Sequence, residues 1–377
     1  MDLGIGVTSV NCVDAAVGIA DEFDLPLMLI ASRRQVDACD LGGGYVNRWC
    51  TEEFARYVRA RDHRRNVTLA RDHGGPWQRD SDLESASADE AMAAARFSFE
   101  IDIASGFELI HLDPVRHLGQ NGTDRIERYI ERTIALHEFC HAAAHRAGRA
   151  IGIEIGTEEC PIGDAPPRDV ARILDGVVAH CDRERLPRPR FMVVPCGTKV
   201  METRNVGPLS TLPSPEGDEP PDDDLRDLIA RCHAAGVAVK AHNADYLPDA
   251  RLGWFIEHEI DAVNVAPEFG VVETRALLAT LRRAGCDALA ERFLELAFAS
   301  RKWEKWMLPD SDADDVARAI IAGHYVYSTP EFAEIIAAAR PACRGRGIDL
   351  DRELVSAVRG AILGYLVALG CCERLAR

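Results

Sequence analysis

Histidine and carboxylate side chains occur in two sets along this chain of 377 residues. The first is His137-Glu138-Phe139-Cys140-His141, an H-E-x-x-H string of the kind that binds zinc on a helix of many metallopeptidases. The second set follows the ends of short apolar runs and consists of Asp72, His73, Asp113, Glu158, His242 and Asp245. Imidazole nitrogens and carboxylate oxygens are common ligands of zinc, manganese and cobalt. Either set could therefore hold a divalent ion, and the expected fold must decide between them.

The apolar runs predict eight strands, at 3–10, 26–32, 66–72, 107–113, 151–156, 191–196, 237–242 and 261–267. Amphipathic stretches between them predict helices at 13–23, 52–61, 86–105, 125–149, 168–183, 224–235 and 250–257. Strands that are apolar on nearly every residue and alternate with helices are typical of a parallel sheet covered on both faces. Eight such units fit a (β/α)8 TIM barrel, an α/β fold. An open doubly wound sheet is the weaker alternative, because no G-x-G-x-x-G follows the first strand.

The region after the eighth strand shows no further strand pattern. We expect residues 1–285 to form the barrel and residues 286–377 to form a C-terminal helical extension. Residues 207–224 combine proline, glycine and acid, which predicts an insertion after the sixth strand, either a plain surface loop or a mobile lid.

The second histidine and carboxylate set follows the strands, and in a TIM barrel the carboxyl ends of all strands meet at one mouth. We expect a divalent metal there, zinc first with manganese or cobalt as alternatives, held by His73, His242, Glu158 and Asp113. Such an ion polarises a carbonyl and stabilises an enediolate, and a carboxylate beside it moves the proton. The candidates for proton transfer are Asp72, Glu158, Asp113 and Asp245. Taken singly, Asp72 or Asp113 could instead cap the next helix.

Positive side chains are predicted near the same mouth in an otherwise acidic chain. Arginine suits planar anions such as phosphate and carboxylate, which favours an anionic sugar over the alternative of plain solvated cations. The candidate substrate-binding residues are Arg33, Arg34, Gln35, Lys199, Lys240 and Asn243.

The H-E-x-x-H string falls on the predicted helix 125–149, which belongs to the outer layer of the barrel. His137, His141 and His145 recur every four residues and share one face of that helix, which we expect to face solvent. A peptidase needs a third ligand and an open fourth position on zinc, and Glu158 points to the mouth instead. We interpret the match as chance, with an adventitious surface metal as the alternative.

The bulk composition narrows the class of protein. A net charge of -17 is unsuited to binding nucleic acid without sequence preference, which needs Lys and Arg against phosphates. Asp2 stands where a signal peptide would carry a basic residue, and the longest apolar stretch, around 361–372, is too short to span a bilayer. The twelve cysteines are scattered without a C-x-x-C pair, so we expect reduced thiols and a cytoplasmic protein without membrane contact.

Several blocks of the chain carry a family resemblance. LARDHGGPWQ, LIHLDP, IGTEE and KAHNADY, preceded by QVDACDLGGGY and followed by SRKWEKWMLPD, resemble blocks in the same order in the class II tagatose-bisphosphate aldolase accessory-subunit family. The resemblance covers roughly residues 4–330. It implies a TIM barrel and sugar or sugar-phosphate substrates. Some members are non-catalytic subunits of an aldolase, and others resemble metal-dependent epimerases of ketoses such as tagaturonate.

The resemblance also implies roles for single residues. Asp72 and His73 match the family's Asp-His pair, Asp113 its strand-four Asp and Glu158 its strand-five Glu, while His242 and Asp245 match its strand-seven pair. Arg33, Arg34 and the block after the sixth strand depart from the family pattern, where substrate would be recognised.

Residues and resemblance together predict a metal-dependent epimerase or aldolase that acts on an anionic ketose, a sugar phosphate or uronate, through an enediolate-type intermediate. The alternative is a non-catalytic subunit that stabilises a separate class II aldolase. The expected partners are accordingly a small anionic sugar, and an aldolase catalytic subunit or further copies of this chain.

Overall fold

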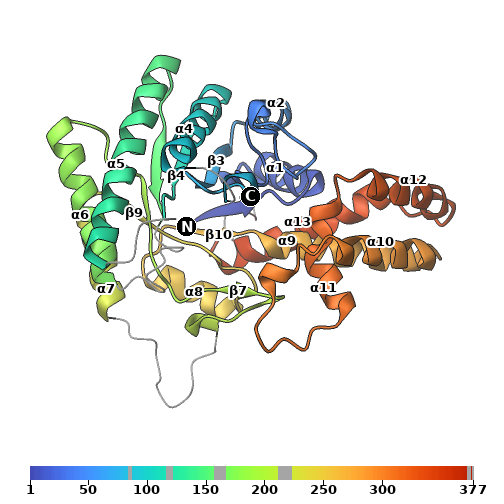
Figure 1. Cartoon of the computed structure of the whole chain (residues 1–377). Coiled ribbons are helices and arrows are strands. Elements are labelled where there is room, and N and C mark those ends of the chain that lie inside the picture. The colour runs from blue at the N-terminus through green and yellow to red at the C-terminus, as the bar shows by residue number, and fades with distance from the viewer. Residues whose placement is uncertain (84–86, 116–121, 157–166, 211–222, 372–374, 376–377) are drawn as a thin grey trace, which may run out of the picture.

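Eight parallel strands close into a barrel at the centre of the molecule (Figure 1). The structure is a computed structural model that describes all residues except 84–86, 116–121, 157–166, 211–222, 372–374 and 376–377. The TIM barrel and all eight predicted strands are confirmed. Hydrogen bonds join neighbours in chain order, and the last strand returns to the first. The strands are β1 (Asp2–Gly6), β2 (Leu27–Ser32), β3 (Val67–Gly74), β4 (Leu109–Leu112), β5 (Gly152–Ile155), β6 (Phe191–Val193), β9 (Ala238–Ala241) and β10 (Ala262–Val265).

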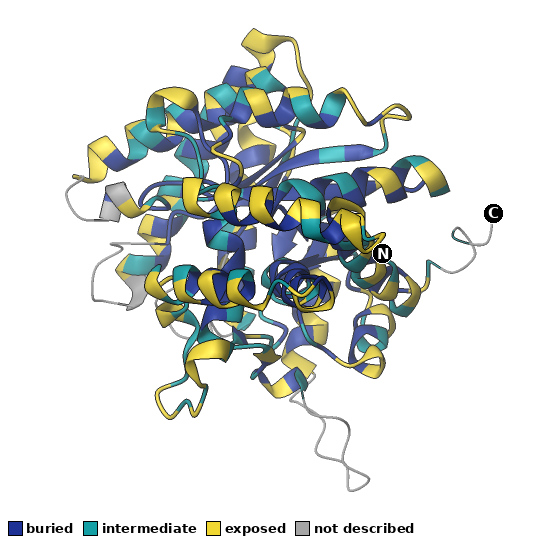
Figure 2. Ribbon diagram, turned by 90° about the vertical axis from the view of Figure 1, so that its right-hand side faces the viewer, coloured by how far each residue is buried: buried dark blue, intermediate teal, exposed yellow. Residues whose placement is uncertain are grey.

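Helices surround the barrel and bury one face each, so that dark strands lie inside a mixed outer layer in Figure 2. The predicted helices are all present. They are α1 (Val10–Phe23), α2 (Thr51–Arg59), α4 (Ala88–Ser105), α5 (Gly122–Ala147), α6 (Pro167–Glu184), α7 (Asp223–Ala234) and α8 (Asp249–Glu257). Local sequence sets their starts: the Ser9 side chain accepts from the Cys12 amide at 2.9 Å, which caps α1.

The connections hold a few small elements that the sequence did not predict. A short helix, α3 (Asp80–Leu83), follows β3, and 3-10 turns lie at η1 (Cys39–Leu41) and η2 (Pro208–Ser210). An antiparallel hairpin joins β7 (Val200–Met201) to β8 (Arg204–Asn205). Strands of two residues are too short for a periodic pattern to reveal. Most of the predicted insertion at 207–224 lies outside the described residues.

The C-terminal region is helical, as predicted. After the last barrel helix, α9 (Pro267–Arg283), come α10 (Asp287–Ala299), α11 (Asp315–Ala322), α12 (Pro330–Gly345) and α13 (Leu350–Ala368), with turns η3 (Glu304–Trp306) and η4 (Gly323–Val326). None of the described helices is long and apolar enough to cross a membrane.

Helix α13 connects the C-terminal region to the barrel. It packs against α1 and α9, and its residues divide between two apolar cores. Val358, Ile362 and Leu366 belong to the core around the barrel, whereas Leu350 and Leu354 belong to a second core among α9, α10 and α12. The boundary at 285/286 stays a prediction, and α13 ties the residues on its two sides together.

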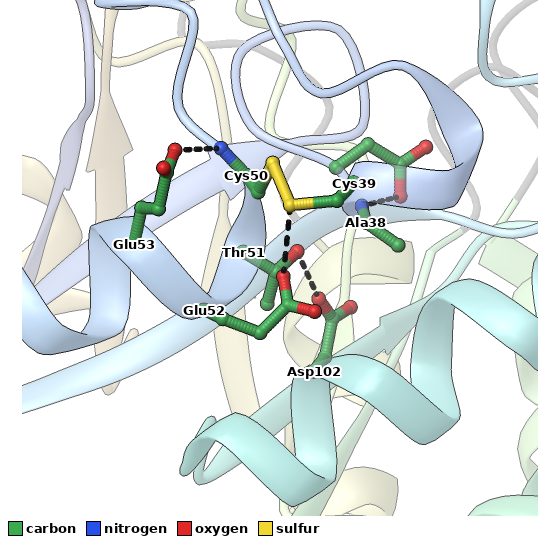
Figure 3. Close-up of a disulfide and its surroundings, with 8 residues drawn as sticks. Ala38, Cys39, Cys50, Thr51, Glu52, Glu53 and Asp102 are labelled. Atoms are coloured by element: carbon green, nitrogen blue, oxygen red, sulfur yellow. Dashed lines mark hydrogen bonds between the residues drawn. A yellow bond between two sulfur atoms is a disulfide. The ribbon is translucent and has the colours of Figure 1, made fainter.

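The expectation of reduced thiols is wrong for one pair of cysteines. Cys39 and Cys50 form a disulfide in the loop after β2, with Cα atoms 4.9 Å apart (Figure 3), which is within the usual range for a bridge. Their scattered positions gave no sign of pairing, because the turn that brings them together is not visible as a motif. Six further cysteines are free thiols: Cys12, Cys140, Cys181, Cys232, Cys286 and Cys343.

Candidate active site

Three histidines from three strands meet at the mouth of the barrel. His73 lies on β3, His111 on β4, and His242 directly after β9. Their ring centroids are 5.3 Å apart for His73 and His111, 5.6 Å for His73 and His242, and 5.1 Å for His111 and His242. The predicted convergence of His73 and His242 is therefore present, and His111 joins them.

An irregularity at the end of β3 turns His73 toward its neighbours. The register of β3 against β4 shifts between Arg71 and Gly74, and His73 has a positive φ of 40°, a costly backbone conformation for a non-glycine residue. Its amide donates to His111 Nδ1 at 3.0 Å. Gly75, at φ 139°, lies so close to the Asp113 backbone that a Cβ there would approach it to 2.9 Å.

Two buried carboxylates hold two of the histidines. Asp113 Oδ2 lies 2.9 Å from His73 Nδ1, and Glu154 Oε1 lies 2.8 Å from His242 Nε2. The other oxygen of Glu154 accepts from Lys240 Nζ at 2.7 Å. Carboxylates that bind one ring nitrogen in this way orient histidines for metal binding or proton transfer. Both His73 and His242 are oriented by such a carboxylate.

The carboxylates of this cluster stay ionised although they are buried. Burial alone would raise the pKa of Asp72, but the neighbouring rings of His73, His111 and His242 hold it well below its usual value. Burial also acts to raise the pKa of Glu154, but Lys240, His111 and His242 lower it below its usual value. The pKa of Asp113 is lowered against burial chiefly by its bond to His73. These carboxylates therefore remain anionic at neutral pH beside the histidines and Lys240.

The donors at the mouth fit a divalent metal. Asp72, His111 and His242 each offer an atom, and these atoms lie within 4.8 Å of one another. Three buried atoms, Asp72 Oδ1, His111 Nε2 and Asp113 Oδ1, have no hydrogen-bond partner among the described residues. A mixed set of imidazole and carboxylate groups suits zinc, manganese or cobalt. His242 was a predicted ligand, whereas Asp72 was predicted to move protons and His111 was not selected.

Sequence reasoning missed His111 and Glu154. Both are about 1% exposed, and they are register partners on β4 and β5. A signal was present: Glu154 and Lys240 are single opposite charges inside otherwise apolar strands, and buried charges need partners. Side chains two residues apart face the same way along a strand, so Asp113 already implied an inward-facing His111.

The remaining predicted acids lie elsewhere. Asp245 is buried, but its Oδ1 accepts from the amides of Ala266 and Glu268 at 3.0 and 2.9 Å, so it ties the loop after β9 to the start of α9. Burial raises its pKa to about 7. Glu158, predicted both as a ligand and as a base, lies outside the described residues.

The predicted substrate-binding residues separate into three groups. Lys240 is buried inside the barrel against Glu154, and Lys199 is exposed at the β7–β8 hairpin. Gln35 Oε1 accepts from the Ser32 amide within its own loop, whereas the backbone carbonyl of Asn243 accepts from the side chain of Asn205 on β8.

The two arginines, Arg33 and Arg34, form the third group. They line a cavity beside the mouth, at the carboxyl end of β2 as predicted.

The H-E-x-x-H helix is α5, in the outer layer as predicted, but its histidine face is not a solvent face. His137 is fully buried with Nε2 3.7 Å from Cys181 Sγ on α6, and only His145 is exposed. The reason is that the helix packs against α6 along this face, which a string of histidines did not indicate.

The architecture defines a TIM barrel with a polar mouth of the kind that carries active sites. The sequence matches no protein-family model and no curated protein. Among solved structures, a probable tagatose 6-phosphate kinase from Sinorhizobium meliloti 1021 is similar, with 18% identity and a TM-score of 0.75 over 97% of this chain and 99% of that one.

Two further solved structures are similar over nearly all of this chain. The fructuronate-tagaturonate epimerase of Cohnella laeviribosi has 13% identity and a TM-score of 0.59 over 98% of this chain and 81% of its own. The fructose-bisphosphate aldolase of Campylobacter jejuni has 10% identity and a TM-score of 0.55, covering 98% and 90%. At these identities the likeness concerns the fold.

Proposed function

We propose that this protein is a metal-dependent epimerase or aldolase that acts on an anionic ketose. The observation that carries the proposal is the cluster at the barrel mouth, where Asp72, His73, His111 and His242 converge. The sequence resemblance and the fold shared with a sugar epimerase and an aldolase support a sugar as the substrate.

His73 and His242 are the proposed metal ligands, because each ring is held by a buried carboxylate, Asp113 or Glu154, as is usual for metal-binding histidines. A metal ion bound here supplies a Lewis acid for the substrate carbonyl. His111 lies within reach as a further donor. Gly156 leaves room for it, since a Cβ at that position would lie 2.0 Å from His111 Nε2.

Asp72 is the proposed proton carrier. Its Oδ2 lies 4.0 Å from His73 Nε2, and its lowered pKa keeps it anionic at neutral pH. In epimerisation, the carboxylate removes the proton next to the carbonyl, the electron pair passes into an enediolate, and reprotonation on the other face inverts the carbon. In a retro-aldol reaction, it takes the proton of the hydroxyl on the β-carbon, the carbon–carbon bond breaks as an aldehyde leaves, and the electron pair of that bond passes into an enediolate that is then protonated.

The assignment of roles is tested by metal content and isotope exchange together. His73→Gln and His242→Gln should lose the ion, whereas Asp72→Asn should keep it and lose activity. The exposed His63→Gln provides the matched control, with unchanged metal and activity. Metal lost from Asp72→Asn and kept in His73→Gln would reverse the two roles.

The reaction class is tested on ketose phosphates and uronates in D2O. An epimerase places deuterium at the inverted carbon, and an aldolase releases two fragments that a coupled dehydrogenase detects. If neither label, fragments nor inversion appears with any such ketose, the enzyme proposal fails and the non-catalytic subunit replaces it.

A further inference from the structure

A cavity of about 680 Å³ lies between the loop after β2 and the C-terminal region. Its charged lining consists of Arg33, Arg34, Arg79, Lys302, Lys305 and a single acid, Asp80. Five cations face one carboxylate in a chain whose net charge is -17. Like charges gathered against the overall balance of the protein raise the local concentration of anions.

Arg33 forms the buried wall of this cavity. Its side chain is fully buried, and it is fixed by Asp37 at 3.1 Å, by the Gly75 carbonyl at 2.8 Å and by Asp82 at 3.3 Å. These contacts occupy Nε and Nη1. The Nη2 nitrogen has no hydrogen-bond partner among the described residues. A buried guanidinium nitrogen without an acceptor is costly, and a ligand oxygen in the cavity would satisfy it.

The outer cations are only partly neutralised. Asp80 serves two of them, since it lies 2.8 Å from Arg34 Nε and 3.3 Å from Lys302 Nζ. Lys305 has no carboxylate partner in the described part of the chain and lies over the rings of Trp306 and Tyr325, at 4.8 and 5.3 Å. The cavity therefore keeps several cationic donors available for an anion.

Hydrogen bonds connect the C-terminal segment that carries Lys302 and Lys305 to the mouth of the barrel. The Glu202 amide, in the β7–β8 hairpin, donates to the Trp306 carbonyl at 2.8 Å, and Trp306 Nε1 donates to the Tyr325 hydroxyl at 3.3 Å. On the opposite side, Arg33 binds the Gly75 carbonyl, two residues after His73. The cavity thus adjoins the catalytic end of the barrel.

We propose that this cavity binds the phosphate of a sugar phosphate ester, an inference that rests on the proposed function and narrows its substrate class. A phosphate monoester carries a charge of about -1.5 to -2 at pH 7 with three acceptor oxygens. This matches the net charge of about +2 that remains when the paired carboxylates Asp37, Asp80 and Asp82 are set against the five cations, better than the single charge of a uronate does. The site lies beside β2 and uses the C-terminal region, whereas many TIM barrels bind phosphate after their seventh and eighth strands.

Calorimetric titration of the full chain with inorganic phosphate tests the site without any chemistry. Wild-type protein should bind phosphate, and Lys305→Gln or Arg34→Gln should each weaken binding about tenfold, the effect of losing one charge-assisted contact. Arg301→Gln is the matched control, because Arg301 neighbours Lys302 but does not line the cavity and should leave phosphate affinity unchanged.

Three results would overturn the inference: no phosphate binding by wild-type protein, an equal loss in Arg301→Gln, or galacturonate binding as tightly as phosphate. Asp72→Asn distinguishes this proposal from the proposed function. That variant should bind phosphate like wild type whether or not the protein turns over a ketose. Phosphate binding with no turnover of any ketose would leave the site standing and remove the enzyme.

Discussion

The molecule contains two histidine clusters that differ in their partners rather than in their histidines. At the barrel mouth, His73 and His242 are each held by a buried carboxylate. Between α5 and α6, His137 and His141 lie with their rings 4.5 Å apart, and the contact made by His137 Nε2 is with a thiol, Cys181. The mouth can therefore hold a cation, whereas the outer cluster is part of helix packing.

The pKa values follow the same division. At the mouth, nearby positive groups keep buried carboxylates ionised against burial. In the outer cluster, burial lowers the pKa of His137 to about 4 and also lowers that of His141, so both stay neutral. A zinc motif in the sequence thus does not guarantee a metal-binding environment in the fold. The environment determines whether the histidines can bind a metal.

The largest expected effect comes from Glu154→Gln. Lys240, which is about 1% exposed, would lose its countercharge, and an unpaired buried charge costs about 3–5 kcal/mol. Chemical denaturation should show this loss in the free energy of unfolding. Glu138→Gln is the control from the outer cluster, since Glu138 is half exposed. A similar loss in both variants would contradict the distinction between the clusters.

The metal affinity of the two clusters should differ next most strongly. His242→Gln should lower affinity for zinc by more than about 100-fold, because removing even an outer-shell partner costs about 10- to 100-fold. The double variant His137→Gln with His141→Gln should retain wild-type metal content despite lower stability. Metal analysis after dialysis measures both, and metal lost only from the double variant would move the site to α5.

The outer cluster should make stability depend on pH. His137 has a folded pKa of about 4 and an unfolded value of about 6.5, so the unfolded chain binds the proton first. Its contribution is full above about pH 7, falls as the pH drops from 6.5 to 4, and is constant below that. Between pH 7.5 and pH 5 the loss is about 2 kcal/mol. The free energy of unfolding of His137→Gln should therefore fall by about 2 kcal/mol less than that of the wild type over this pH range. Parallel plots of unfolding free energy against pH for the two proteins would refute the prediction.

The smallest effect is expected at His145, the exposed third histidine of the α5 series. His145→Gln should change the free energy of unfolding by less than about 0.5 kcal/mol and leave metal content unchanged. A larger effect in thermal melts would mean that the whole histidine face is a packed or ligand-binding surface.

The barrel could be predicted because local pattern determines it: strands buried on both faces are mostly apolar. The barrel strands follow that rule, and the main exceptions are the polar carboxyl end of β3, Arg71 to His73, and a single polar residue in each of β4, β5, β9 and β10. The mouth was predicted only in part. Asp72, His73, Asp113 and His242 lie at strand ends, where sequence position suffices. Asp245 also follows a strand, but its side chain binds the amides of Ala266 and Glu268. That orientation depends on contacts between segments distant in the sequence, which no local pattern reveals.

The position of α13 has a consequence for how the chain folds as it is synthesised. Arg359 on α13 pairs with Glu22 on α1 at 2.7 Å, across 337 residues. Ribosomes add about 5–20 residues per second, so α1 waits roughly 20 to 70 s for the helix that covers it. During that time its apolar face is open to chaperones and to other nascent chains. Slowing translation should lengthen this interval and increase aggregation of the nascent chain.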